Sequence, residues 1–212
     1  MRILGIDPGS SCTGYGLVER GAGRAGARGV AHLAHGTLRP PRGASLPVRL
    51  AALQRAFAEL LESLRPDVAV VERAFVAASP RAALVLGHAR GVALAALGGA
   101  GVPVHELAPA EIKLAIAGSG VAEKRHVQAM VQRLLALPAA PSRDAADALA
   151  AALCHAQAGR LVALGARRSR AGATLWRSAP HRADASRAPS ADAADALRTL
   201  GGRSARFVLR RR

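Results

Sequence analysis

Four acidic side chains in this 212-residue chain stand where carboxylates could converge on one site. Asp7 ends the apolar run RILGID, and Glu72 ends the β-branched run VAVVE. Asp144 and Asp147 open an apolar helical pattern three residues apart, so their Cβ atoms would lie about 5–6 Å apart on one helix face. The carboxyl ends of neighbouring parallel strands share one edge of a sheet, where open α/β sheets bind ligands. We therefore expect the four carboxylates to meet if the helix begins at that edge.

Such a cluster predicts a site for hard divalent cations. Four carboxylates repel one another, and burial disfavours their charged forms further. All-oxygen ligand sets suit Mg²⁺ or Mn²⁺, and two such ions about 3.5–4 Å apart form the clamp used for in-line phosphodiester cleavage. We expect two Mg²⁺ ions, with Mn²⁺ as a substitute, and the predicted ligands are Asp7, Glu72, Asp144 and Asp147.

Each acidic residue also has an explanation that needs no metal. Asp7 precedes Pro-Gly and could simply form a turn, and Glu72 could pair with Arg73 or another arginine. Asp144 and Asp147 lie near a helix start, where the helix dipole favours acids. These alternatives stay open for each residue taken singly. It is less attractive to apply such an explanation to all four acids at once, because residues 1–155 contain only 11 acidic side chains.

The basic residues are uneven in type and in position. Of the 30 basic side chains only two are lysines, Lys113 and Lys124. Lysine is a compact point charge, whereas arginine is planar and permanently charged. The scarcity of lysine therefore favours a need for ammonium groups at these two positions, with chance survival as the alternative.

The net charge is +16, and residues 156–212 hold 13 basic but only 3 acidic side chains. Such a charge attracts polyanions such as nucleic acid, although a compositional bias towards Arg and Ala explains the tail equally well.

The elements that must position these residues follow an α/β pattern. Ser45 is a predicted N-cap and Pro47 suits the first turn of a helix that continues to about residue 64. A β-branched strand after a helix is typical of a parallel βαβ unit with a sheet buried on both faces. Strands are predicted at 2–7, 15–19, 29–38, 68–72 and 102–107, and further helices at 81–97, 109–117, 122–136 and 142–158. Beyond residue 158 the periodicity fades, so we expect one domain at 1–158 and a basic, disordered or loosely ordered tail at 159–212.

Composition also bears on location. No run of eighteen consecutive apolar residues occurs, and MRILGID lacks a signal-peptide layout. Cys12 and Cys154 form no disulfide framework and fit a reducing compartment. We expect a cytoplasmic protein with no membrane contact.

Four sequence blocks resemble those of the RuvC family of Holliday-junction resolvases, in family order across about residues 2–157. They are GIDPGSSCTGYG, VVERAFVAASPRAALVLGHARG, GSGVAEKRHVQAMV and LPAAPSRDAADALAAALCHA. The resemblance implies a ribonuclease-H-like α/β fold, with a three-stranded meander plus parallel strands flanked by helices. It also implies a homodimeric, Mg²⁺-dependent endonuclease that cuts four-way DNA junctions in pairs, leaving 5′-phosphate and 3′-hydroxyl ends. Branch-migration proteins of the same pathway are implied partners.

The resemblance also assigns residues. The family's catalytic and metal-binding acids fall on the four carboxylates named above, and its functional lysines fall on Lys113 and Lys124. Its junction-facing aromatic matches Phe75, for which an ordinary core phenylalanine is the alternative. We take Arg81 and Arg90 as candidate phosphate contacts, of the kind that position DNA without reading its sequence. The helix at 81–97 is either the dimer surface or an ordinary core helix.

Three other functions compete with this one. A non-enzymatic reader of branched DNA would share the fold but would not need the complete acidic set. A nucleotide-binding phosphotransferase is raised by DPGSSCTG, which also resembles the first phosphate loop of actin-like ATPases, but a second glycine-rich phosphate loop is not visible. A relative that acts on RNA is the third. No role is predicted for Trp176.

Overall fold

The computed structural model describes residues 1–21, 29–73 and 79–165, with side chains to residue 158. This part of the chain contains a five-stranded mixed sheet in the order β3-β2-β1-β4-β5. An antiparallel meander is formed by β1 (Arg2–Asp7), β2 (Thr13–Arg20) and β3 (Val30–Leu38). The sheet continues parallel to β1 with β4 (Val68–Glu72) and β5 (Val104–Leu107). The predicted meander followed by parallel strands is confirmed.

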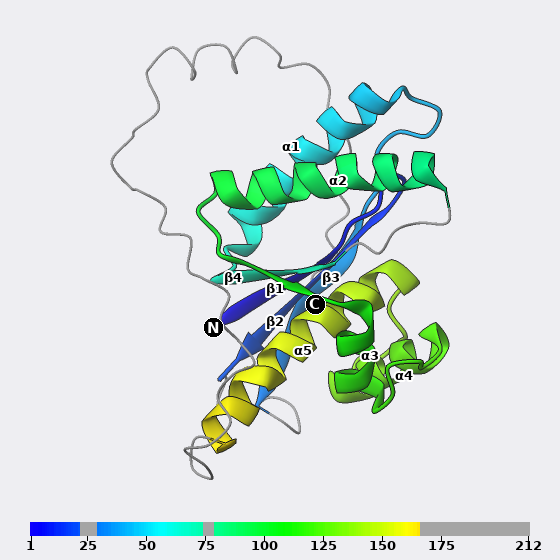
Figure 1. Ribbon diagram of the computed structural model, residues 1–212. Helices are drawn as coiled ribbons and strands as arrows, with labels where there is room; N and C mark the ends of the chain where they lie inside the picture. Colours follow the sequence, from blue (N-terminus) through cyan, green and yellow to red (C-terminus); the bar gives the residue numbers. More distant parts are fainter. Residues whose placement is uncertain (22–28, 74–78, 166–212) are drawn as a thin grey trace. The chain divides into compact units, whose positions relative to one another are not determined.

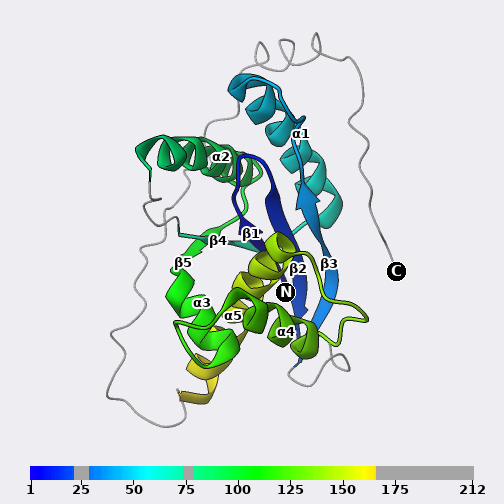
Figure 2. The same ribbon diagram turned by 90° about the vertical axis from the view of Figure 1, so that its right-hand side faces the viewer.

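Helices cover both faces of the sheet (Figures 1 and 2). One face carries α1 (Leu46–Leu64) and α2 (Pro80–Gly99), and the other carries α3 (Pro109–Ala117), α4 (Lys124–Leu134) and α5 (Arg143–Gly165). Side chains alternate along a strand, so Leu4 and Ile6 of β1 enter the core beneath α1 and α2, whereas Ile3 enters the core beneath α5. Both faces of the sheet are thereby buried, as the β-branched runs predict.

Local sequence explains where the helices begin and end. Ser45 is the residue before α1, as predicted, although its side chain makes no capping hydrogen bond, and Pro47 lies in the first turn. The helix stops at Arg65, which has a left-handed backbone (φ 43°) and donates its N–H to the Leu61 carbonyl. The last helix, α5, extends to Gly165, beyond the predicted end at residue 158.

Three glycines let α5 lie directly against the β1–β2 hairpin. A Cβ built on Gly5 would overlap the carbonyl oxygen of Ala148, and one on Gly14 would overlap that of Asp144. A Cβ on Gly16 would meet the side chain of Leu149. Because no side chain intervenes at these points, the backbone of α5 approaches the sheet closely. This contact brings the first turn of α5 to the end of β1, where Asp7 lies.

Most of α2 is not buried. Its buried residues are Ala89, Ala93 and Leu97, and Leu84 is 66% exposed. Among the described residues α2 is the one helix whose length and composition would suffice to cross a membrane, although His88 and Arg90 interrupt its apolar run. The helix contacts α1 and the sheet on one side. It therefore presents an apolar surface that the described part of the chain leaves uncovered.

Candidate active site

Asp7 and Glu72 occupy equivalent places on neighbouring strands. The parallel pairing of β1 with β4 sets Ile6 against Val71, and the next residue of each strand is one of the two acids. Both carboxylates are half-buried. The expectation that these two strand ends share one edge of the sheet is met.

The first turn of α5 adds the other two acids. The Asp144 backbone lies against Gly14, the residue that pairs with Asp7 in the β1–β2 ladder. One helical turn later, Asp147 is largely buried, with 15% of its side chain exposed, and its Oδ2 accepts a hydrogen bond from Lys124 Nζ across 2.9 Å. The two aspartates therefore reach the site from the helix while Asp7 and Glu72 reach it from the sheet.

The electrostatics show that these groups act on one another. Burial raises the pKa of Asp7 to about 7, and the charges of Glu72, Asp147 and Asp144 add to the rise while Lys124 opposes it. Burial likewise raises the pKa of Glu72, with Asp147 adding to it and with Lys124 and Lys113 acting against it. Asp147 in turn raises the pKa of Lys124. Four carboxylates and both lysines of the chain thus form a single cluster.

The lysines come from two different helices on the same face of the sheet. Lys113 is half-buried on α3, and Lys124 is the first residue of α4, with 59% of its side chain exposed. The scarcity of lysine in the sequence therefore coincides with a place where the fold gathers acids. Whether either lysine acts in catalysis stays a prediction.

The acidic cluster suits a hard divalent cation by its chemistry. Carboxylate oxygens are the ligands that Mg²⁺ and Mn²⁺ prefer. Burial and, after it, the neighbouring carboxylates raise the pKa values of Asp7 and Glu72, and a cation would favour their charged forms. Within residues 1–21, 29–73 and 79–158, no three His, Cys, Asp or Glu side chains already stand in a ligating arrangement. The four carboxylates nevertheless fit the ion by type and by charge.

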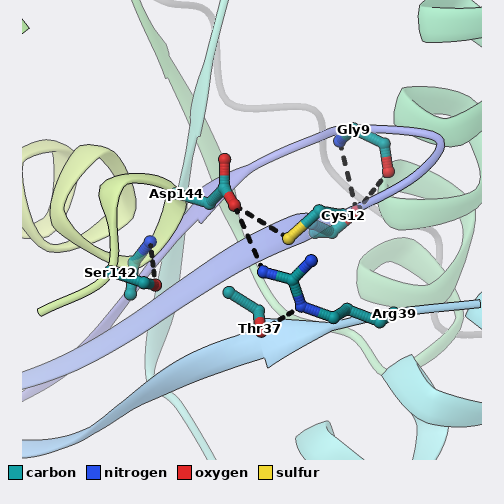
Figure 3. A network of polar contacts seen from close by, with 8 residues as sticks. Gly9, Cys12, Thr37, Arg39, Ser142 and Asp144 are labelled. Carbon is teal, nitrogen blue, oxygen red and sulfur yellow. Dashed lines mark hydrogen bonds and ion pairs between the residues drawn. The ribbon is translucent and has the colours of Figure 1, made fainter.

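Polar contacts hold Asp144 from the side facing β2 and β3 (Figure 3). Cys12 Sγ donates to Asp144 Oδ2 across 2.8 Å, and Arg39 Nη2 lies 3.9 Å from the same oxygen. Neither Cys12 nor Arg39 was predicted as a site residue. Cys12 is only five residues from Asp7, in the loop that follows β1, but nothing in its local sequence signals a contact with residue 144.

The residues predicted to contact DNA differ in exposure and in their partners. Phe75 falls outside the described residues, and so do Trp176 and the tail from residue 166. Arg81 is exposed in the first turn of α2. Arg90 is mostly buried and pairs through Nη2 with Glu106 Oε2 across 2.7 Å, while its Nε has no partner in the described part of the chain. The DNA-binding roles of all three residues stay predictions.

The mixed sheet flanked by helices, with carboxylates at one edge, has the ribonuclease-H-like fold of resolvase nucleases. The family model described as "Crossover junction endodeoxyribonuclease RuvC" matches residues 3–155. The chain belongs to the RuvC family. Crossover junction endodeoxyribonuclease RuvC of Alkalilimnicola ehrlichii is 54% identical over 154 residues, which cover 73% of this chain and 90% of that protein. The Halorhodospira halophila protein of the same name is 54% identical over 155 residues, or 73% and 89% of the two chains.

Solved structures agree with this assignment. Thermus thermophilus RuvC in complex with a Holliday junction substrate is 34% identical, with a TM-score of 0.68 over 76% of this chain and 96% of that one. The yeast mitochondrial Holliday junction resolvase Ydc2 is 18% identical, with a TM-score of 0.53 over 74% of this chain and 78% of that one. The second likeness concerns the fold alone. The predicted family and fold class are thus confirmed.

Proposed function

We propose that this protein resolves four-way DNA junctions by hydrolysing phosphodiester bonds with the help of divalent cations. The observation that carries the proposal is the convergence of Asp7, Glu72, Asp144 and Asp147 from β1, β4 and α5 in a chain of the RuvC family. The junction itself is proposed as substrate because the Thermus thermophilus relative was solved with a Holliday junction substrate. A nucleotide phosphotransferase would need a second phosphate loop, which no described element supplies.

The four carboxylates would hold two Mg²⁺ ions, with Mn²⁺ as a substitute. Two such ions, when bound, lower the pKa of a water and stabilise the leaving oxygen of a phosphodiester. Lys113 and Lys124 would offset the negative charge of the scissile phosphate. Lys124 now donates to Asp147, so in the loaded site it would share its N–H groups between that carboxylate and the phosphate. The products would be a 5′-phosphate and a 3′-hydroxyl.

Basic and aromatic residues outside the cluster would position the DNA. Arg81 is exposed and free to meet a phosphate, whereas Arg90 would have to do so while paired with Glu106. Phe75 would stack on bases at the crossover, a contact worth about 1–3 kcal/mol per base. The basic tail at 159–212 would add non-specific affinity through its charge.

A homodimer would give two such sites for a pair of cuts. The exposed face of α2 borders a groove of about 1070 Å³ between α1 and α2, and its walls are almost entirely apolar. The lining residues include Leu50, Pro80, Ala83, Leu84, Val92 and Ala95. A second copy of the chain is the proposed occupant, because a twofold interface needs a self-complementary patch. Leu84→Glu should then convert dimers to monomers in sedimentation experiments, and a dimer that survives this change would contradict the assignment.

Two further statements rest on the family resemblance, for the partner proteins, and on composition, for the location. We infer that branch-migration proteins of the same pathway act with this protein. We also infer a cytoplasmic location. No feature of the described residues tests either inference.

A nicking assay tests the proposed activity. A synthetic four-way junction with labelled strands is incubated with the protein, with and without Mg²⁺, and the cuts are mapped. Paired cuts on strands of like orientation, dependent on Mg²⁺ and absent from a linear duplex of the same sequence, are expected. Asp7→Asn and Glu72→Gln should abolish cutting but keep junction binding. Binding without any cutting by the unaltered protein would instead identify a non-enzymatic junction reader.

A further inference from the structure

Side chains from the loop before β2 and from the end of β3 contact Asp144 (Figure 3). Cys12 Sγ donates to Asp144 Oδ2 across 2.8 Å, and Arg39 Nη2 approaches the same oxygen to 3.9 Å. Arg39 Nε donates to Thr37 Oγ1 across 3.3 Å. Cys12, Arg39 and Thr37 are therefore connected to Asp144 by one continuous set of contacts.

Strand register and helix packing create this set of contacts. The antiparallel pairing of β2 with β3 sets Thr13 against Leu38, so Cys12 and Arg39, the next residues outward, emerge at the same end of the sheet. The absence of a side chain at Gly14 admits the Asp144 backbone beside them. Three separate segments thus meet at one carboxylate, and none of them carries a sequence signal for the contact.

The two carboxylate oxygens of Asp144 differ in their contacts. Oδ2 receives both the thiol and the guanidinium, whereas Oδ1 has no hydrogen-bond or ion-pair partner in the described part of the chain. A carboxylate fixed through one oxygen can rotate much less, and hydrogen bonds to metal-binding side chains commonly fix them in this way. A thiol can donate one hydrogen bond, and the Cys12 thiol donates it to Asp144 Oδ2.

We propose that Cys12 is a positioning residue that, with Arg39, holds Oδ2 of Asp144 so that Oδ1 is the oxygen offered to a divalent cation. Cys12 touches neither the substrate nor the cation in this arrangement and acts only through Asp144. The inference rests on the proposed metal-dependent function. It adds that the affinity of the site for its cation depends on a hydrogen bond from outside the acidic cluster.

Binding of Mn²⁺ to the full-length, DNA-free protein tests this inference. Free Mn²⁺ is measured by electron paramagnetic resonance for the unaltered protein and for Cys12→Ala, Cys12→Ser and Cys12→Val. Loss of a hydrogen bond to a metal ligand weakens metal binding by about tenfold or more, so Cys12→Ala and Cys12→Val should weaken Mn²⁺ binding about tenfold. Cys12→Ser keeps a donor and should bind nearly as well as the unaltered protein. Cys154→Ala, which removes the buried thiol of α5 away from the acids, is the matched control and should not change the affinity.

The nicking assay supplies the second readout. Cys12→Ala should need more Mn²⁺ for its half-maximal rate yet approach the unaltered rate at saturating Mn²⁺. The inference is overturned if Cys12→Ala and Cys12→Val bind Mn²⁺ as tightly as the unaltered protein, if Cys12→Ser is as weak as they are, or if the unaltered protein binds no Mn²⁺. An unaltered protein that binds Mn²⁺ but cuts no junction would refute the proposed function, while the binding comparison would still decide the role of Cys12. Cys12→Val preserves the side-chain volume and serves if Cys12→Ala fails to fold.

Discussion

Glu72 raises the pKa of Asp7 across the gap between two adjacent parallel strands, and only burial contributes more to the shift. The register of β1 with β4 makes this proximity unavoidable, since Ile6 pairs with Val71 and one acid follows each of them. A metal-free site of this kind is electrostatically unfavourable. The protein therefore holds together charges that a bound cation would stabilise.

The metal-free protein should lose stability as the pH rises towards neutrality. The pKa of Asp7 is raised from 3.8 to about 7 in the folded state, so the folded chain binds a proton that the unfolded chain has released between these values. The contribution of Asp7 to stability thus falls as the pH rises through this window. Asp7→Asn should raise the melting temperature at about pH 8 and leave it nearly unchanged near pH 4 in calorimetry.

Addition of Mg²⁺ provides the control for that experiment. The cation should stabilise the unaltered protein at about pH 8 more than it stabilises Asp7→Asn, because binding to the folded state raises stability by mass action. Equal melting temperatures of the two proteins at this pH, without metal, would contradict the electrostatic description of the site.

Lys124→Arg should slow cutting although it keeps the positive charge. The Lys124 ammonium donates to Asp147 across 2.9 Å beside Asp7 and Glu72, and a planar guanidinium cannot occupy the same place as a compact charge. We expect the single-turnover nicking rate at saturating Mg²⁺ to fall about tenfold or more. Arg125→Lys, at the next and exposed position, is the matched control and should cut normally. An unchanged rate for Lys124→Arg would show that position 124 does not require an ammonium group.

Gly14→Ala should damage both stability and activity. The new Cβ would overlap the Asp144 carbonyl oxygen, and backbone on both sides leaves little freedom to yield. We expect the free energy of unfolding to fall by about 1–3 kcal/mol, and the nicking rate to fall even well below the melting temperature because Asp144 is displaced. Gly98→Ala, where the added Cβ meets open space on α2, should instead stabilise the protein by about 0.5–1 kcal/mol. A Gly14→Ala protein with normal stability would mean that α5 can move away from the hairpin at no cost.

His32 should make the protein sensitive to acid. Its Nε2 lies 2.8 Å from His35 Nδ1, and burial, with His35 adding to it, lowers the pKa of His32 from 6.5 to about 4. The unfolded chain therefore binds this proton first, and the stability that neutral His32 contributes is lost as the pH falls from 6.5 through about 4. His32→Gln should flatten the fall of the melting temperature across this range, whereas His126→Gln, at an exposed position of α4, should not. Parallel melting curves for His32→Gln and the unaltered protein would refute the prediction.

Local patterns in the sequence predicted most of the secondary structure. The β-branched run ending at Glu72, the apolar spacing from Leu46 to Leu64 and the strands that follow α1 and α2 appear where expected. Burial of an apolar face and backbone propensity act over such short stretches. The acids at the ends of β1 and β4 could be paired from sequence for the same reason, since parallel strands present their carboxyl ends at one edge. The end of α5 was missed, because the helix continues to Gly165, beyond the residues whose apolar periodicity predicted it.

The sequence by itself determined which residues could hold a cation, since carboxylates at two strand ends and a helix start are visible as letters. Only the tertiary structure decided what surrounds them. Cys12 and Arg39 meet Asp144 because strand register and a glycine contact bring together segments more than a hundred residues apart, and Arg90 is paired with Glu106 because α2 crosses β5. Such contacts depend on packing between elements, and local residue preferences carry no information about them.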